Sequence, residues 1–257
     1  MFTNNFDPVA FQIFSIEFRW YSLAYIMGIL LGWIYCKKKI INNQKILDLF
    51  DDFITYVILG IIIGGRIGYV LFYNLQYYIE NPIEIFYVWN GGMSFHGGLI
   101  GVILATQIFS KNNKSNPFIF LDLVSLSAPI GIFFGRLANF INSELYGTPA
   151  EIPWSVKFIL IDNINRHPSQ LYEAFFEGIV LFFILRYFYN KNYTIKPGLL
   201  SSLFLIFYSF FRFLTEFFRS PDPHIGYLFL NLTMGQIISV IFMILGLILF
   251  VYKKNEN

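Results

Sequence analysis

Three arginines lie within or at the edge of hydrophobic runs of this 257-residue chain, namely Arg66, Arg136 and Arg212. A guanidinium keeps its charge at any biological pH, and its planar fork matches a phosphate group through two parallel hydrogen bonds. Inserting a charged side chain into the centre of a membrane costs on the order of 3 kcal/mol of free energy. Such residues are therefore kept mainly where they bind a ligand or a charged partner. Any one of them could instead form a structural pair between helices, for example Arg66 with a glutamate of the span 168–189, but three together predict a site for an anionic headgroup.

One histidine stands in a setting suited to proton transfer. His96 is flanked by the pairs Gly91–Gly92 and Gly97–Gly98, and small residues leave room for a ligand near a helix entrance. An imidazole has an unperturbed pKa near 6.5, which makes His96 a candidate general base. A hydrogen-bonded structural histidine is the alternative interpretation, and His167 is the competing candidate for the base.

Carboxylates accompany the arginines at helical spacing. Glu216 follows Arg212 by one helical turn on the same face, and Gln170, Glu173 and Glu177 share one stripe of another helix. Buried arginines need carboxylate partners. Glu173 and Glu177 are therefore either structural partners of the arginines or members of the site.

The composition indicates the solvent in which these residues must be positioned. Hydrophobic residues make up 56% of the chain and charged residues only 13%, against roughly 25% charged residues in a soluble domain. A net charge of +2 gives no basic field for nucleic acid. One cysteine and three histidines provide no ligand set for zinc. We expect an integral membrane protein without a metal or cofactor.

Apolar runs of about 17–25 residues, the length that crosses a bilayer as a helix, recur along the chain. They predict an all-α polytopic membrane protein with a single domain, 1–257, and about seven spans. The spans are 20–36, 53–73, 94–109, 118–138, 168–189, 198–217 and 234–251.

The loop charges predict the orientation. One set of loops carries ten lysines and the other set carries three basic residues, Lys157, Arg166 and Arg219. The lysine-rich side is expected to be cytoplasmic. The N-terminus is then periplasmic, the C-terminus cytoplasmic, and the buried charges lie in the outer half of the membrane. Segment 139–167 becomes a small periplasmic cap over the site, or a plain loop.

Six separated blocks resemble the bacterial prolipoprotein diacylglyceryl transferases. The blocks are GGRIGYVLFYN (64–74), WNGGMSFHGGLIG (89–101), GRLANFINSELYG (135–147), RHPSQLYE (166–173), FRFLTEFFRSPD (211–222) and MGQIIS (234–239). The resemblance implies an inner-membrane enzyme. It would transfer the diacylglyceryl group of phosphatidylglycerol to the lipobox cysteine in a prolipoprotein signal peptide, forming a thioether and releasing glycerol phosphate.

The resemblance also implies which residues form the site. His96, Arg136 and Arg212 are the expected catalytic residues, and the expected substrate contacts are Tyr21, Arg66, Arg136, Asn139, Glu144, Gly147 and Glu216. Some positions depart from the family pattern, namely Ala138, Ser143, Tyr146 and Thr148. These departures affect the expected shape of the cap and leave the expected reaction unchanged.

Two other classes of membrane protein remain to be separated from this interpretation. A secondary transporter also places charges inside a bundle, but the sequence has no inverted repeat. An intramembrane serine protease needs a serine matched to a histidine on another span, and none is evident. Cys36 lies beside Lys37 to Lys39 on the cytoplasmic side, so we expect it to be a bystander.

Overall fold

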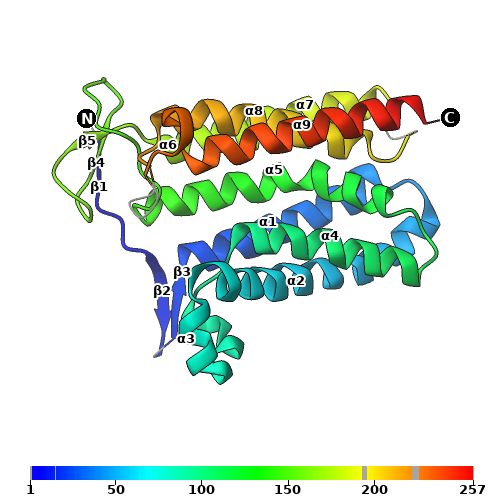
Figure 1. Cartoon of the computed structure of the whole chain (residues 1–257), viewed down its shortest axis with the longest axis horizontal. Coiled ribbons are helices and arrows are strands. Elements are labelled where there is room, and N and C mark those ends of the chain that lie inside the picture. The colour runs from blue at the N-terminus through cyan, green and yellow to red at the C-terminus, as the bar shows by residue number, and fades with distance from the viewer. Residues whose placement is uncertain (1, 15, 193–195, 222–225, 257) are drawn as a thin grey trace. The chain divides into compact units, whose positions relative to one another are not determined.

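The chain forms two compact units in the computed structural model. One unit comprises Met1–Cys36 with Asp122–Asn257, and the other comprises Lys37–Leu121 (Figure 1). The structure describes residues 2–14, 16–192, 196–221 and 226–256.

Helices occupy all the places at which the sequence predicts one. They are α1 (Trp20–Tyr35), α2 (Gln44–Tyr73), α4 (Phe95–Asn112), α5 (Pro117–Ile141), the continuous run of α6 (Ser169–Glu173), η4 (Ala174–Val180) and α7 (Leu181–Asn190), α8 (Leu199–Thr215) and α9 (Met234–Asn255). Helix α2 begins earlier than expected, because the Asn43 side chain caps it by accepting a hydrogen bond from the Ile46 N–H.

Shorter helical segments connect the long helices. They are η1 (Cys36–Ile40), α3 (Leu75–Glu80), η2 (Pro82–Phe86), η3 (Val88–Asn90), η6 (Glu216–Phe218) and η7 (Phe229–Asn231). Two segments, η1 and η4, are π-helical. A π-helical turn inside an α-helix often marks a functional site, and η4 carries Glu177.

The all-α expectation is wrong in detail, because the structure contains short strands. Strand β1 (Phe2–Asn4) pairs in parallel with β4 (Val156–Phe158), which pairs in antiparallel with β5 (Asn165–Arg166). Strands β2 (Val9–Ile13) and β3 (Ile16–Arg19) form an antiparallel hairpin before α1. The β1–β4 pairing joins segments about 150 residues apart in the chain, and local periodicity carries no signal for such a pairing.

The Lys37–Leu121 unit is built on close contact between α2 and α4. Glycines line this contact, so the two backbones touch: a Cβ on Gly60 would lie 2.6 Å from the Gly101 carbonyl oxygen, and one on Gly68 would lie 2.7 Å from the Gly97 Cα. Helix packing through small residues is typical of membrane proteins. Of the glycines flanking His96, Gly97 thus serves this helix packing, whereas a Cβ on Gly91 would have no described neighbour within 4 Å.

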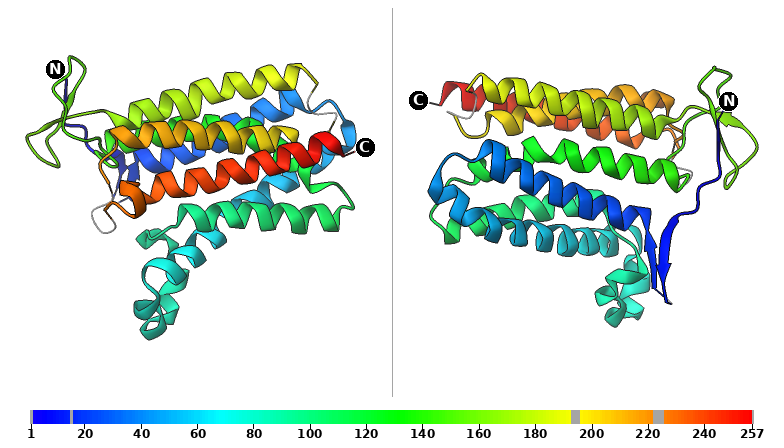
Figure 2. Two further views of the ribbon diagram at one scale, coloured as in Figure 1. Left: turned by 45° about the horizontal axis from the view of Figure 1, so that its top comes forward. Right: turned by 180° about the vertical axis from the view of Figure 1, so that it is seen from behind.

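In the other unit, α8 packs against α9 and against the run of α6, η4 and α7. Figure 2 shows these helices running alongside one another. Strand β1 lies at one end of the unit, and the C-terminal end of α9 lies at the other.

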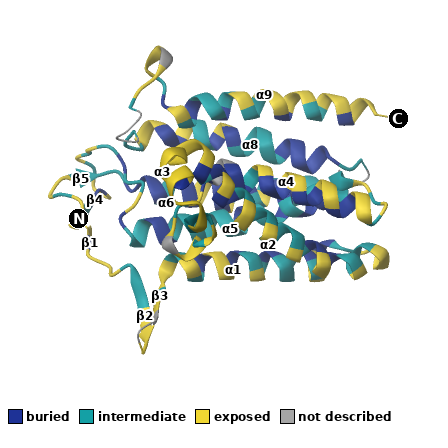
Figure 3. Ribbon diagram, turned by 60° about the horizontal axis from the view of Figure 1, so that its bottom comes forward, coloured by how far each residue is buried: buried dark blue, intermediate teal, exposed yellow. Residues whose placement is uncertain are grey.

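The helix surfaces are suited to lipid. Among the described residues, three helical stretches are long and apolar enough to cross a membrane: Pro117–Ile141, Leu199–Phe218 and Met234–Asn255. Helix α9 exposes large apolar side chains along its length, including Ile244, Leu247 and Ile248 (Figure 3). Contiguous exposed apolar surface of this kind requires a lipid environment or a partner. The chain is a mostly helical membrane protein.

Candidate active site

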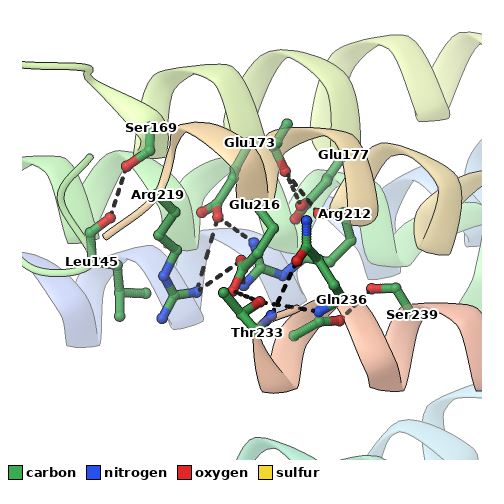
Figure 4. Close-up of polar contacts among 12 residues, drawn as sticks. Leu145, Ser169, Glu173, Glu177, Arg212, Glu216, Arg219, Thr233, Gln236 and Ser239 are labelled. Carbon is green, nitrogen blue, oxygen red and sulfur yellow. Dashed lines mark hydrogen bonds and ion pairs between the residues drawn. The ribbon is translucent and has the colours of Figure 1, made fainter. Parts of the chain in front are cut away.

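The centre of the site is a carboxylate that binds two arginines. Glu173, on α6, is fully buried; one of its oxygens lies 3.0 Å from Nη1 of Arg136 on α5, and the other accepts a 2.5 Å hydrogen bond from Nη1 of Arg212 on α8. Figure 4 shows Glu173 facing Arg212 between the helices. The two predicted phosphate-binding arginines are therefore brought together, each already holding an acidic partner.

Two further carboxylates complete this group. Glu177, also fully buried, accepts a hydrogen bond of 3.0 Å from Nη2 of Arg136. Glu216 lies 2.6 Å from Nη2 of Arg212, as the one-turn spacing predicts. Arg219 lies 4.0 Å from both Glu173 and Glu216. We call these six residues the Arg–Glu cluster: Arg136, Arg212, Arg219, Glu173, Glu177 and Glu216.

Helix α9 supports the cluster from one side. The Thr233 hydroxyl donates a 2.8 Å hydrogen bond to Glu216 and also caps α9, where Gln236 completes a capping box. A Cβ on Gly235 would lie 2.6 Å from a Glu216 oxygen. The start of α9 therefore has room for Glu216 only because position 235 is glycine.

The segment after α5 is held by side chains that the sequence singles out. Asn139 donates from Nδ2 to Glu144 at 3.0 Å, and Gln170 donates from Nε2 to the Glu144 backbone carbonyl at 2.6 Å. The Ser169 hydroxyl donates to the Leu145 carbonyl at 2.9 Å. The amide and carboxylate pair of Asn139 and Glu144 thus lies at the same end of α5 as Arg136.

Gly147 lies where three chain segments meet. Its N–H donates to the His167 carbonyl at 3.1 Å, and the next N–H, of Thr148, donates to the Phe218 carbonyl at 3.0 Å. A Cβ at position 147 would lie 2.6 Å from the His167 Cβ and 2.7 Å from the Phe218 carbonyl oxygen. Any side chain here would separate the cap from the end of α8.

Tyr21, on the first turn of α1, is positioned by a second tyrosine. Its ring packs edge-on against Tyr25 at 5.0 Å, and the two hydroxyls lie 3.5 Å apart. The electrostatic neighbours of the Tyr25 hydroxyl include Arg136 and Glu144. The tyrosine pair therefore belongs to the same end of this unit as the Arg–Glu cluster.

His167 takes part in a chain of hydrogen bonds in the cap. The indole N–H of Trp154 donates to the Tyr172 hydroxyl at 2.8 Å, and that hydroxyl lies 3.1 Å from Nδ1 of His167. Burial lowers the pKa of His167 below its ordinary value. Its imidazole is therefore a weaker base than a free histidine, and its Nδ1 is already in contact with the Tyr172 hydroxyl.

Arg66 and His96 belong to the Lys37–Leu121 unit. The Arg66 guanidinium is buried in a shell of backbone oxygens, and it donates to the carbonyls of Glu84, Ile85, Tyr87, Gly91 and Gly92. The central carbon of this guanidinium, Cζ, also lies 5.0 Å from the centre of the Tyr78 ring. His96 lies in the first turn of α4, and its side chain lies outside the described residues.

Sequence reasoning left part of this site undecided. Glu173 and Glu177 were open between structural and functional roles, and Arg219 counted only as a loop charge. The sequence pattern that could have identified the two glutamates is the helical stripe of Gln170, Glu173 and Glu177. In the structure, all three of these polar side chains are fully buried. Among the described residues, no group of His, Cys, Asp and Glu is arranged to hold a metal ion.

Comparison with known proteins gives consistent matches along the chain. The family model for prolipoprotein diacylglyceryl transferase matches residues 8–252. A phosphatidylglycerol-prolipoprotein diacylglyceryl transferase of Rickettsia bellii (strain OSU 85-389) is 51% identical over 256 residues, covering 98% of this chain and 97% of the relative. The protein of the same name from Azospirillum brasilense is 47% identical over 255 residues, with coverages of 97% and 95%.

The carbonyl shell predicts a structural role for Arg66. Lysine keeps the charge but offers three donors instead of five, so Arg66→Lys leaves at least two buried carbonyls without a partner, at about 1–3 kcal/mol each. We expect a lower unfolding temperature and faster proteolysis between residues 82 and 92. The control, Arg19→Lys, changes a side chain that is 63% exposed and should alter neither. Unchanged stability together with lost lipid binding would instead make Arg66 a ligand residue.

Proposed function

Because the chain belongs to the prolipoprotein diacylglyceryl transferase family, we propose that its Arg–Glu cluster is where the phosphate of phosphatidylglycerol binds. The chain is a transferase that moves the diacylglyceryl group of phosphatidylglycerol to prolipoproteins in lipoprotein maturation. One observation carries the assignment of the site: Arg136 and Arg212 converge on Glu173 from two different helices. Two guanidinium groups held this close can bind one phosphate from two sides.

The reaction needs two kinds of help from the protein. The thiol sulfur of the acceptor cysteine attacks a glyceryl carbon, the carbon–oxygen bond to phosphate breaks, and glycerol phosphate leaves with the electron pair of that bond. Arg136 and Arg212 neutralise the charge that grows on the phosphate. A base must accept the thiol proton, because the thiolate is the nucleophile.

Three of the remaining predicted contacts, Asn139, Glu144 and Tyr21, are assigned to the headgroup. Asn139 and Glu144, which already bond to each other, offer an amide and a carboxylate to the two hydroxyls of the glycerol headgroup. Tyr21 adds a phenol near the same end of α5. Gly147 acts by allowing the cap to close against His167 and Phe218, and it touches no substrate in this proposal.

The protein is proposed to sit in the bacterial inner membrane with seven spans and a periplasmic site. In support, helix α6, which carries Glu173, lies toward the end of its unit that carries β1, and the C-terminus lies at the opposite end (Figure 1). A reporter that is active only in the cytoplasm, inserted near Thr148, should therefore be silent. Strong reporter activity at this position would reverse the orientation.

The phosphate assignment predicts the effect of lysine at the two central arginines. With phosphatidylglycerol as sole donor and a lipobox peptide as acceptor, the wild-type protein should form the thioether. Arg136→Lys and Arg212→Lys should each lower the transfer rate about 10- to 100-fold, because lysine lacks the bidentate fork. The control is Arg186→Lys on α7, whose guanidinium stacks on Tyr189 at 5.0 Å. Normal turnover in both cluster variants would exclude a phosphate fork.

His96 is proposed as the base that accepts the thiol proton. His96→Gln should bind phosphatidylglycerol and transfer slowly, by about 10²–10⁴ in rate. The defect should shrink as the pH approaches the thiol pKa near 8.5, where the peptide supplies its own thiolate. The matched variant is His167→Gln, which should show no pH-dependent rescue. If only His167→Gln is rescued by high pH, the base is His167; a flat defect in His96→Gln indicates a structural histidine.

A further inference from the structure

The Arg–Glu cluster is electrically balanced. Among the described residues, the ion pairs that join it link three arginines to three glutamates, and the side chains of Glu173 and Glu177 are fully buried. With every group ionised, its net charge is zero. A buried set of paired charges is stable while each charge keeps its partner, and it becomes costly when one charge is added or removed.

A phosphodiester adds one negative charge to this balanced group. The donors that it needs are also in use, because Nη1 and Nη2 of Arg136 face Glu173 and Glu177. An anion that binds to the fork formed by these two nitrogens must therefore displace a carboxylate from Arg136. The displaced carboxylate would then be a buried charge without a partner, which proteins avoid by neutralising the group.

The three carboxylates differ in how firmly they are held. Glu173 has Arg136, Arg212 and Arg219 within 4.0 Å. Glu216 has Arg212, Arg219 and the Thr233 hydroxyl. Among the described side chains, Glu177 has one guanidinium within 4.0 Å, that of Arg136, and the Thr215 hydroxyl at 3.3 Å.

The surroundings of Glu177 also disfavour its ionised form, because a second carboxylate, Glu173, lies close by. Its charged and titratable neighbours are Arg136 from α5, Arg212 and Tyr208 from α8, and Glu173 from its own helical run. Glu173 and Glu177 share the Arg136 guanidinium, so the two like charges repel each other. Protonation of Glu177 removes this repulsion and frees Nη2 of Arg136.

We propose that Glu177 takes up a proton when phosphatidylglycerol binds, which releases Arg136 to hold the phosphate. The inference rests on the proposed function and adds no covalent step. The proton comes from solvent, it remains on the Glu177 carboxyl while the anion is bound, and it returns to solvent when glycerol phosphate leaves. The thiol proton of the acceptor is a separate proton.

Proton uptake tests this directly in the wild-type protein. The protein is placed in phosphatidylcholine nanodiscs in weakly buffered solution with a pH-indicator dye, and short-chain phosphatidylglycerol is added. We expect uptake of about one proton per bound lipid, and an apparent Kd that rises about tenfold per pH unit. Added short-chain phosphatidylcholine should cause no uptake. Phosphatidylglycerol that binds without proton uptake overturns this inference and leaves the proposed function standing, whereas no binding at all removes both.

Variants assign the proton to a residue. Glu177→Gln should bind phosphatidylglycerol with no proton uptake and with an affinity that is flat across pH, because the amide is permanently neutral. Glu80→Gln, a change at an exposed glutamate of α3, should behave as wild type. Full uptake in Glu177→Gln, with uptake lost in Glu216→Gln, would place the proton on Glu216 and overturn the assignment to Glu177.

Discussion

The structure of the Arg–Glu cluster depends on the two shortest ion pairs of Glu173, with Arg136 and Arg212. This one buried carboxylate joins α6 to Arg136 on α5 and to Arg212 on α8, so three helices are fixed at one level by a single side chain. Breaking a buried pair by removing one partner leaves an uncompensated charge and costs about 3–5 kcal/mol. The other contacts of the cluster add to this bridge, since Glu177 shares Arg136 and Glu216 shares Arg212.

The cap is attached to the same framework through backbone contacts. Gly147 is hydrogen-bonded to His167, just before α6, and its neighbour Thr148 is bonded to Phe218, just after α8. The cap is therefore tied to the two helices that carry Glu173 and Arg212. Gly147 has no functional group, and its small size sets the distance between the segments that carry these charges.

The helices could be predicted from the sequence, because apolar length is a local signal. The sequence also singled out Arg136 and Arg212, which the structure brings together at Glu173. The pairing of Arg212 with Glu216 followed from helical spacing. The partners of Arg136 could not be predicted in this way, since its contacts with Glu173 and Glu177 join residues some 40 positions apart. The pairing of β1 with β4 could not be predicted for the same reason, because the two strands are far apart in the sequence. The shell of backbone carbonyls around Arg66 could not be predicted either, because carbonyls are present at every residue and leave no signature in sequence.

The buried arginines thus divide by the kind of acceptor that they hold. Arg66 binds backbone carbonyls, which cannot leave without unfolding the segment that carries them. Arg136 and Arg212 bind side-chain carboxylates, which can rotate away or become neutral. Carboxylate and phosphate present matching oxygen pairs to a guanidinium, so one can replace the other. Under the proposed function, an arginine paired with a carboxylate can exchange that partner for an anionic lipid, whereas an arginine bound to carbonyls would first have to release the backbone that it holds.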